Sequence, residues 1–296
     1  MTVEDKKLPD GLVTDQLARK IHVCYPEGRT RAFTLSYDDG NDCDAPLVEM
    51  MRKYGVKGTF NLNSAMGYQW KEEKLWRRMS MEECVSLYGE DMEIAVHGAL
   101  HSNWTQLSTA DAMVDILDDR RNLERVTGKI IRGAAYPFGS YNKYVAEILR
   151  LADIQYCRTC GDTGKTKLKD MPNWLKLRPT CHHNDPRLME IAQKFLKGTG
   201  NNTLHLFYVW GHSYEFVQDN NWDVMEQLLS SVSGREDVWY ATNIEIVEYL
   251  KASQCLIYNL DQTLARNPTD IDLWIKITPA NQAVKIPAGV TMELPL

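Results

Sequence analysis

Two aspartates stand side by side in the segment Ser36-Tyr-Asp-Asp-Gly40. Adjacent carboxylates can divide the work of a hydrolytic site, because one can bind a cation while the other accepts a proton. The simpler explanation is an Asp-Gly turn, since both residue types are common in turns. Asp38 and Asp39 are therefore candidate site residues. Whether they have a functional role depends on which other side chains lie beside them.

A second segment, His97-Gly-Ala-Leu-His101, carries two histidines four residues apart. In a helical turn this spacing brings both imidazoles to one side, where they can reach one metal ion. Ordinary structural histidines are the alternative. With Asp39 they would form a set of two histidines and one carboxylate with open positions for water and substrate. Such a set suits Zn²⁺ or another divalent transition metal, with cobalt, nickel and manganese as further possibilities.

Two more segments follow apolar, strand-like runs. His212 lies in Trp210-Gly-His-Ser-Tyr214, directly after LHLFYVW, and Ala135-Tyr-Pro-Phe-Gly139 follows another short apolar run. In an α/β barrel, catalytic residues sit where strands end. His212 is thus a candidate catalytic group or a polar strand cap. Tyr136, Pro137 and Phe138 would shape a pocket wall or form a simple turn.

These segments need a scaffold that brings strand ends together. Short β-rich runs alternate with helical patterns, and Ser80–Glu83 is a capping box that would begin one of the helices. Strands are expected at Arg31–Tyr37, Gly58–Leu62, Glu93–Val96, Ile130–Ala135, Gln155–Thr159, Leu175–Thr180, Leu204–Trp210 and Val238–Ala241. Seven or eight such repeats predict an α/β fold, a TIM-like (β/α) barrel of parallel strands. The pattern changes after Ser253, so we expect a barrel over residues 1–252 and a small β-rich appendage over 253–296.

Composition excludes several classes of protein. The 34 Lys+Arg and 40 Asp+Glu residues give a formal net charge of −6, which argues against a nucleic-acid or membrane-surface partner. No apolar run approaches the ~18 residues of a membrane span. The first twenty residues are polar and lack the apolar centre of a secretory signal, so a cytoplasmic location is expected unless a leader has been removed from the sequence. The seven scattered cysteines, including the pair Cys157 and Cys160, are expected to be reduced.

Together the segments SYDDG, HGALH, AYPFG and WGHS resemble the polysaccharide deacetylases of carbohydrate esterase family 4, which have the NodB homology fold. The resemblance covers roughly residues 30–250. It implies a distorted barrel and metal-dependent removal of acetyl groups from N-acetylated sugars. By the same resemblance Asp38 would be the catalytic base and His212 the catalytic acid. The implied metal ligands are Asp39, His97 and His101.

The sequence departs from the family pattern in several places. The family has Ser or Thr where this chain has Gly98, and the arginine that orients the catalytic base in the family falls on Ala135. Arg158 is our first candidate to supply that guanidinium, followed by Arg178 and then Arg132. Trp174 is a possible counterpart of an aromatic groove residue in the family. The cluster Pro179–His183 has no family match, and we expect His182 or His183 to contact substrate.

Three functions remain open at this point. The first is an N-deacetylase that acts on an acetylated carbohydrate. The second is an O-acetyl esterase or a hydrolase of small cyclic amides and ureides on the same fold. The third, a carbohydrate-binding protein without catalysis, is disfavoured because both aspartates and the three histidines are kept. Neither the sugar nor the oligomeric state follows from the sequence.

Overall fold

The computed structural model describes residues 20–66, 76–168, 170–197 and 202–295. The polar N-terminal residues 1–19, on which the expected absence of a secretory signal rests, lie outside this part. The chain forms two compact units. The larger comprises residues 31–199 and 205–248, and the smaller takes in segments within 1–30, 200–204 and 249–296. The sequence analysis placed all of residues 1–252 in the barrel. In the structure, residues 20–30 and 249–252 belong to the smaller unit.

The larger unit is built on an eight-stranded sheet in which every strand pair is parallel. This sheet confirms the predicted distorted (β/α) barrel. Its strands are β2 (Arg31–Asp38), β3 (Gly58–Leu62), β4 (Glu93–Val96), β5 (Gly133–Ala135), β6 (Tyr156–Arg158), β7 (Cys181–His182), β8 (His205–Gly211) and β9 (Val238–Tyr240). The order is β6-β5-β4-β3-β2-β8-β7, and β9 also pairs with β2.

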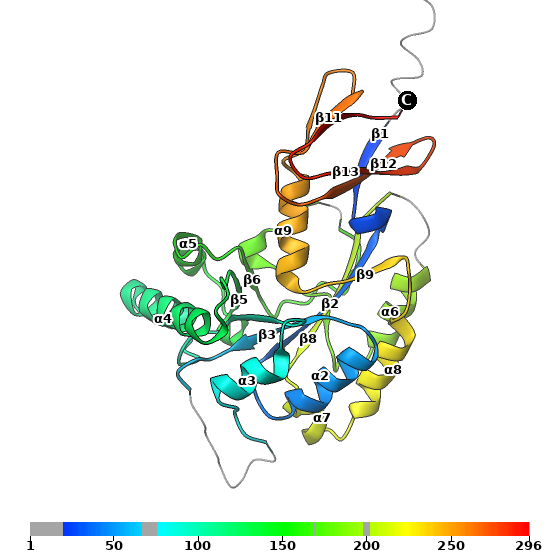
Figure 1. Ribbon diagram of the computed structural model, residues 1–296. Helices are drawn as coiled ribbons and strands as arrows, with labels where there is room; N and C mark the ends of the chain where they lie inside the picture. Colours follow the sequence, from blue (N-terminus) through cyan, green and yellow to red (C-terminus); the bar gives the residue numbers. More distant parts are fainter. Residues whose placement is uncertain (1–19, 67–75, 169, 198–201, 296) are drawn as a thin grey trace, which may run out of the picture. The chain divides into compact units, whose positions relative to one another are not determined.

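Helices connect these strands and lie around the outside of the sheet (Figure 1). The expected capping box is present, because Ser80 Oγ accepts the Glu83 backbone N–H at 3.2 Å and Glu83 Oε2 accepts the Ser80 N–H at 2.7 Å. The helices are α2 (Asp44–Lys53), α3 (Met81–Tyr88), α4 (Thr109–Thr127), α5 (Lys143–Leu151), α6 (Leu188–Lys197), α7 (Tyr214–Gln218), α8 (Trp222–Val232) and α9 (Asn243–Ser253). Among the described residues, no helix is both long and apolar enough to cross a membrane.

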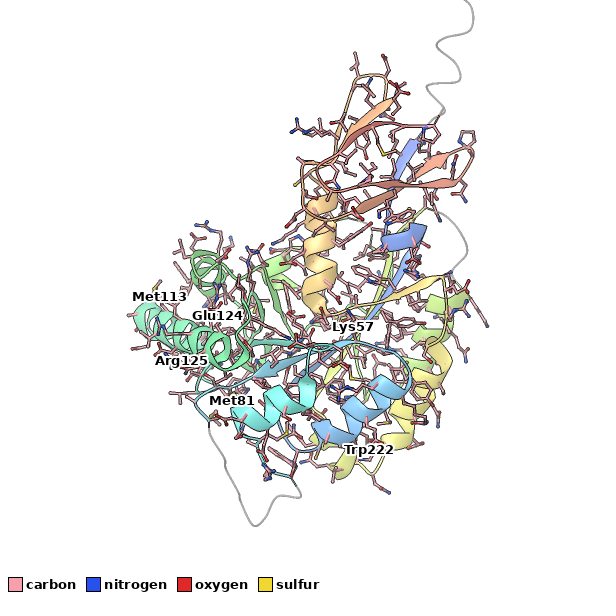
Figure 2. The ribbon with its side chains drawn as sticks, viewed as in Figure 1. Lys57, Met81, Met113, Glu124, Arg125 and Trp222 are labelled. Carbon is pink, nitrogen blue, oxygen red and sulfur yellow. The ribbon has the colours of Figure 1, made fainter. Side chains whose placement is uncertain are left out.

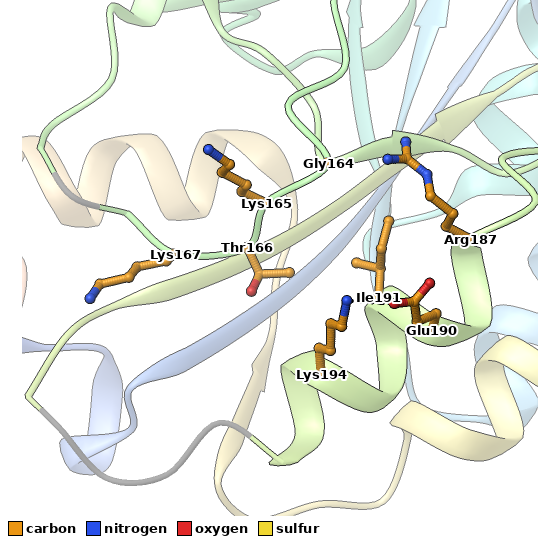
Figure 3. Close-up of a pocket in the computed structure, with 8 residues that line it drawn as sticks. All are labelled: Gly164, Lys165, Thr166, Lys167, Arg187, Glu190, Ile191 and Lys194. Atoms are coloured by element: carbon orange, nitrogen blue, oxygen red, sulfur yellow. Dashed lines mark hydrogen bonds and ion pairs between the residues drawn. The ribbon is translucent and has the colours of Figure 1, made fainter.

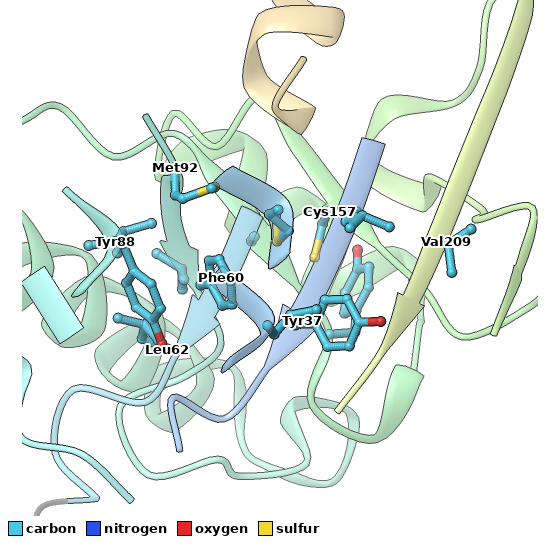
Figure 4. Close-up of a cluster of buried hydrophobic side chains, with 14 of the residues drawn as sticks. Tyr37, Phe60, Leu62, Tyr88, Met92, Cys157 and Val209 are labelled. Carbon is cyan, nitrogen blue, oxygen red and sulfur yellow. The ribbon is translucent and has the colours of Figure 1, made fainter. Parts of the chain in front are cut away.

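Side-chain alternation along the strands separates two environments. In β2, Phe33, Leu35 and Tyr37 pack into the apolar core against the helices. The residues between them point the other way, into the barrel, where Ser36 Oγ accepts a hydrogen bond from Asn61 of β3. Figure 4 shows part of the apolar core, and Figure 2 labels half-buried side chains that pack against it, such as Met81 and Trp222. The barrel interior is therefore polar, and it ends at Asp38.

The barrel is closed irregularly between β6 and β8. The sequence predicts a strand over Leu175–Thr180, but this prediction was wrong: the segment begins with a short 3-10 helix, η4 (Trp174–Lys176), and the strand β7 is only Cys181–His182. Leu177 forms a single parallel bridge with Arg158, and β7 then pairs with β8. Pro179 lies between these two contacts and has no N–H to donate to a ladder, which limits the strand.

The smaller unit contains two three-stranded sheets around its own apolar core. One has the order β1-β12-β13, formed by β1 (Lys20–Cys24), β12 (Leu273–Thr278) and β13 (Gln282–Ile286), and all its pairs are antiparallel. The other joins β10 (Ile257–Tyr258), β11 (Leu264–Arg266) and β14 (Thr291–Glu293). The expected β-rich C-terminal segment thus forms its sheet together with β1, a strand from the N-terminal part of the chain.

Candidate active site

Asp38, the last residue of β2, is almost completely buried and held by two side chains. Arg158 donates from Nη2 to Asp38 Oδ2 at 2.5 Å, and Asn61 donates from Nδ2 to Oδ1 at 2.8 Å. Burial by itself raises the pKa of a carboxyl group, but the Arg158 guanidinium, with smaller effects of His97 and His212, outweighs it and lowers the pKa of Asp38 to about 2. Asp38 is therefore an ionised, oriented carboxylate.

Arg158 reaches Asp38 from the position that pairs with Ala135. The two residues are Cα partners in the parallel register of β5 and β6. The Arg158 guanidinium is fully buried and lies 4.6 Å above the Trp210 ring. The other two candidates are engaged elsewhere: Arg178 donates to the backbone oxygens of Gly161 and Asp162, and Arg132 pairs with Asp153 at 2.9 Å.

Asp39, His97 and His101 offer three ligand atoms that all lie within 4.8 Å of one another. Asp39 has a φ of 83°, a left-handed conformation that is strained for a non-glycine residue and that sets the direction of its carboxylate. Its Oδ1 atom is buried and makes no hydrogen bond, although Arg78 Nη2 approaches it to 3.3 Å. An unsatisfied buried carboxylate oxygen beside two imidazoles fits a divalent cation.

The protonation of the two imidazoles fits the same role. His97 donates from Nδ1 to the carbonyl oxygen of Ala135 at 2.9 Å, so the neutral ring has a bare Nε2 to coordinate with. Burial, reinforced by the neighbouring His97, lowers the pKa of His101 to about 4, and burial also lowers the pKa of His97. Both rings are thus neutral near pH 7, the form that binds a metal.

The two histidines do not lie on a helix as their spacing predicted. His97 directly follows β4, and the chain then turns through Gly98 with a φ of 78° and His101 with a φ of 53°. A Cβ atom on Gly98 would lie 2.6 Å from Asp115 Oδ2 and 3.0 Å from Trp104 Nε1. Glycine is therefore required here, because Trp104 donates to Asp115 at 2.7 Å across the space that a side chain would need.

His212, after β8, faces Asp38 across the site, with 3.9 Å between Nε2 and Asp38 Oδ2. Its other nitrogen, Nδ1, lies 3.3 Å from Oε1 of Glu215 in α7, and its backbone N–H donates to Glu215 Oε2 at 3.1 Å. Burial lowers the pKa of His212, but the hydrogen bond to Glu215 and the charges of Asp38 and Asp39 outweigh it, so the net shift is upward. Sequence analysis missed Glu215; its signal is a carboxylate three residues after a strand-end histidine.

The other proposed substrate contacts divide between the site and the core. Phe138 is 65% exposed, and its ring centroid lies 4.6 Å from that of His101, so it borders the metal ligands. Tyr136 and Pro137 are buried, and Tyr136 donates to the Leu175 carbonyl at 2.7 Å, so Tyr136 is a core residue. Trp174 begins η4 and is half-buried. His182 lies beside Glu215 rather than beside Asp38, with 3.1 Å between its Nε2 and Glu215 Oε2.

A separate cavity of about 530 Å³ lies along α6 (Figure 3). It is lined by Lys165, Lys167, Arg187, Glu190 and Lys194 among others, and it contains none of the residues described above. Lys194 pairs with Glu190 inside the cavity, and Arg187 pairs with Asp185, which does not line it. Four basic side chains and one carboxylate thus line the cavity, and none of them belongs to the strand-end cluster.

The sequence profile of the polysaccharide deacetylase family matches residues 26–157, which include Asp38, Asp39, His97 and His101. The match covers less than half of the chain and shows that this part is similar to the polysaccharide deacetylase family. No curated protein sequence matches the chain.

Three solved structures with a similar fold are distant in sequence. One, from Mycobacterium smegmatis and assigned to the polysaccharide deacetylases, is 16% identical with a TM-score of 0.51, over 79% of this chain and 94% of that one. A family 4 carbohydrate esterase from Streptomyces lividans, in complex with acetate, is 13% identical with a TM-score of 0.49, over 72% and 93%. A Streptococcus pyogenes deacetylase in complex with acetate is 17% identical with a TM-score of 0.39; the match covers 48% of this chain but only 61% of that protein. The first of these supports the barrel fold.

Proposed function

We propose that this chain is a metal-dependent hydrolase that removes acetyl groups from N-acetylated saccharides. The observation that carries the proposal is the placement of an ionised, arginine-held Asp38 between His97, at 3.8 Å, and His212, at 3.9 Å. A carboxylate that can accept a proton and a nearby histidine that can donate one suit the hydrolysis of an amide.

Asp39, His97 and His101 would hold the divalent cation, with zinc the first choice for two imidazoles and one carboxylate. When bound, such a cation lowers the pKa of water in its coordination sphere and polarises an acetyl carbonyl. The bare Nε2 of His97 and the Oδ1 of Asp39, which makes no hydrogen bond, are the atoms that this chain offers for that purpose.

Asp38 and His212 would move the protons. Asp38 Oδ2 accepts the proton of the attacking water, and the Arg158 contact keeps that oxygen ionised and oriented. His212 donates its Nε2 proton to the departing amine, while Glu215 at Nδ1 stabilises the protonated ring. The amide C–N bond breaks, and the products are acetate and a free amine. An O-acetyl ester needs this acid less, because an alkoxide leaves more readily than an amide anion.

Acetate release decides between these reactions. Purified protein is incubated with N-acetylated and with O-acetylated oligosaccharides, before and after chelation and after zinc is restored. We expect release from N-acetylated substrates that is lost with chelator and regained with zinc. Asp38→Asn should keep its metal and lose about 10²-fold or more in kcat, the scale of general acid–base catalysis. Activity only on O-acetyl esters, or full activity of Asp38→Asn, would contradict the proposal.

A further inference from the structure

A second group of metal-ligating side chains lies on the other side of His212 from Asp38. His182, the last residue of β7, and His183 after it place their Nε2 atoms 3.1 Å and 3.2 Å from Oε2 of Glu215. One ligand atom from each of these three residues lies within 4.8 Å of the other two. His212 separates this cluster from the proposed metal site, because its Nε2 lies 3.9 Å from Asp38 Oδ2 and its Nδ1 lies 3.3 Å from Glu215 Oε1.

The short contacts of this cluster are not hydrogen bonds. Both ring nitrogens of His183 are buried without a hydrogen-bond partner, although Nε2 lies beside a carboxylate. Among the described residues, Glu215 also forms no ion pair with a lysine or an arginine. A buried polar atom that makes no hydrogen bond is costly to the fold. A cation between the imidazole and the carboxylate would give both groups a partner.

The packing around His183 fixes which of its nitrogens faces the cluster. Its fully buried ring stacks on Phe216, with the centroids 4.2 Å apart, and on Tyr37, at 5.7 Å. A Cβ atom added to Gly211 would lie 2.0 Å from Nδ1, so the ring lies directly against the backbone of β8 and requires glycine there. Nδ1 is thus covered, and Nε2 is the nitrogen that faces Glu215.

The donor set and its spacing suit zinc. Two imidazoles and one carboxylate are typical zinc ligands, and ligand atoms about 2.0–2.1 Å from a tetrahedral zinc lie about 3.3 Å from one another. The two nitrogen–oxygen distances of this cluster, 3.1 Å and 3.2 Å, are close to that value. The side chains of His182 and Glu215 are 21% and 22% exposed, so an ion can enter from solvent and water can be its fourth ligand.

The proton of His182 makes this site weaker than the first. The Asn184 backbone N–H donates to His182 Nδ1 at 3.1 Å, so the neutral ring carries its proton on Nε2. A metal at Nε2 requires that proton on Nδ1, so binding has to give up this hydrogen bond. His97 needs no such change, because its Nδ1 already donates to the carbonyl oxygen of Ala135.

We propose that His182, His183 and Glu215 form a second divalent-metal site, which takes up zinc from solution after the first site is filled. The proposal concerns metal binding alone and does not depend on the proposed deacetylase activity. It assigns a role to the histidines of β7, which lie away from Asp38 and for which the proposed reaction has no use.

Zinc binding to the purified protein tests the proposal. Protein that has been dialysed to remove loosely held metal is titrated with zinc in competition with a chromophoric chelator. We expect one tightly held zinc and a second, weaker equivalent. His97→Ala/His101→Ala should lose the tight equivalent and keep the weaker one. His182→Ala and Glu215→Gln should keep the tight zinc and bind the second at least about 10²-fold more weakly, since loss of a ligand exceeds the 10–100-fold effect of losing a ligand's outer partner.

His205→Ala is the matched control, because His205 begins β8 at the end opposite Gly211 and its Nδ1 lies 3.1 Å from Thr166 Oγ1, outside both clusters. It should bind both equivalents. Anomalous diffraction from a zinc-soaked crystal should place the second ion between His183 Nε2 and Glu215. A wild type without a second equivalent, or a second equivalent that persists in His182→Ala and Glu215→Gln, would overturn the site. Two zinc ions bound without acetate release would refute the proposed function and leave the second site standing.

Discussion

Arg158→Lys tests how the base is held. The guanidinium is fully buried, donates to Asp38 Oδ2 at 2.5 Å and lies on the Trp210 ring. Lysine keeps the positive charge, so the pocket stays electrically balanced and the variant should fold. It loses the planar group that both stacks on the indole and directs an N–H at the carboxylate. The substitution therefore keeps the positive charge beside Asp38 and removes only the oriented guanidinium contact.

The size of the effect follows from the Asp38 contacts. The pKa of Asp38 is about 2, against an ordinary value of 3.8, because the Arg158 charge outweighs burial. The net lowering corresponds to roughly 2 kcal/mol at 1.36 kcal/mol per unit, and the contribution of Arg158 is larger than this net value because burial opposes it. Lysine retains part of it, and a hydrogen bond to a charged group is worth about 1.5–3 kcal/mol. We therefore expect kcat/KM near neutral pH to fall about tenfold. The base must be ionised to act, so a higher Asp38 pKa moves the acidic limb of the pH profile upward.

The assay is acetate release from an N-acetylated oligosaccharide across pH, with zinc content measured on each sample. Arg178→Lys is the matched control, because Arg178 binds only the backbone oxygens of Gly161 and Asp162 and should leave the profile unchanged. Zinc content should be equal in all three proteins. An unchanged profile in Arg158→Lys, or the same shift in Arg178→Lys, would show that the contact with Arg158 does not set the ionisation of Asp38.

Three further predictions concern the metal ligands, the turn between them and a buried carboxyl group. The double variant His97→Ala/His101→Ala should lose its zinc by elemental analysis, and metal content equal to wild type would disprove the assignment. Gly98→Ala should lower Tm more than Gly128→Ala does, because both glycines have positive φ but an added Cβ meets other atoms only at Gly98. We expect the two variants to differ by about 1–3 kcal/mol in unfolding free energy, and equal losses would contradict the clash at Gly98. Burial raises the pKa of Glu93 to about 7 from 4.5, so the protonated side chain favours the folded state. This contribution to the free energy of unfolding is complete below about pH 4.5 and is lost as the pH rises to 7. Glu93→Gln should therefore gain about 3 kcal/mol in unfolding free energy relative to wild type between those pH values in denaturant titrations, and a difference independent of pH would refute the raised pKa.

The alternation of β-rich runs and helices was enough to predict the barrel. Parallel strands place all their carboxyl ends at one edge, so segments far apart in the chain, such as the aspartates after β2 and His212 after β8, had to meet there. The sequence also carries the reason for the polar interior, since the apolar residues of β2 alternate with Thr34, Ser36 and Asp38. The sequence pattern therefore predicted which residues lie at the strand ends and in which direction their side chains point.

Local conformations that depend on distant residues were not predictable in this way. The turn after His97 is set by the Trp104–Asp115 hydrogen bond, which belongs to another segment. Strand β1 pairs with β12, so that Lys20 lies opposite Thr278, and no local pattern indicates such a pairing. Glu215 was overlooked because a carboxylate three residues after a strand end also fits a helix cap, and its backbone contact with His212 has that form. Its contacts with His212 Nδ1 and His182 Nε2 exist only in the folded chain.

Arg158 shows which part of the site follows from the sequence pattern and which part follows from the register of the sheet. Ala134 and Cys157 point into the apolar core, so Ala135 and Arg158, one residue further along β5 and β6, point into the barrel. These two positions are register partners, and side chains from either one enter the same space beside Asp38. The guanidinium that compensates the charge of Asp38 comes from Arg158. Arg158 can therefore take the place that an arginine at position 135 would occupy. Alternation alone makes Arg158 point inward; that it lies opposite Ala135 follows only from the pairing of β5 with β6.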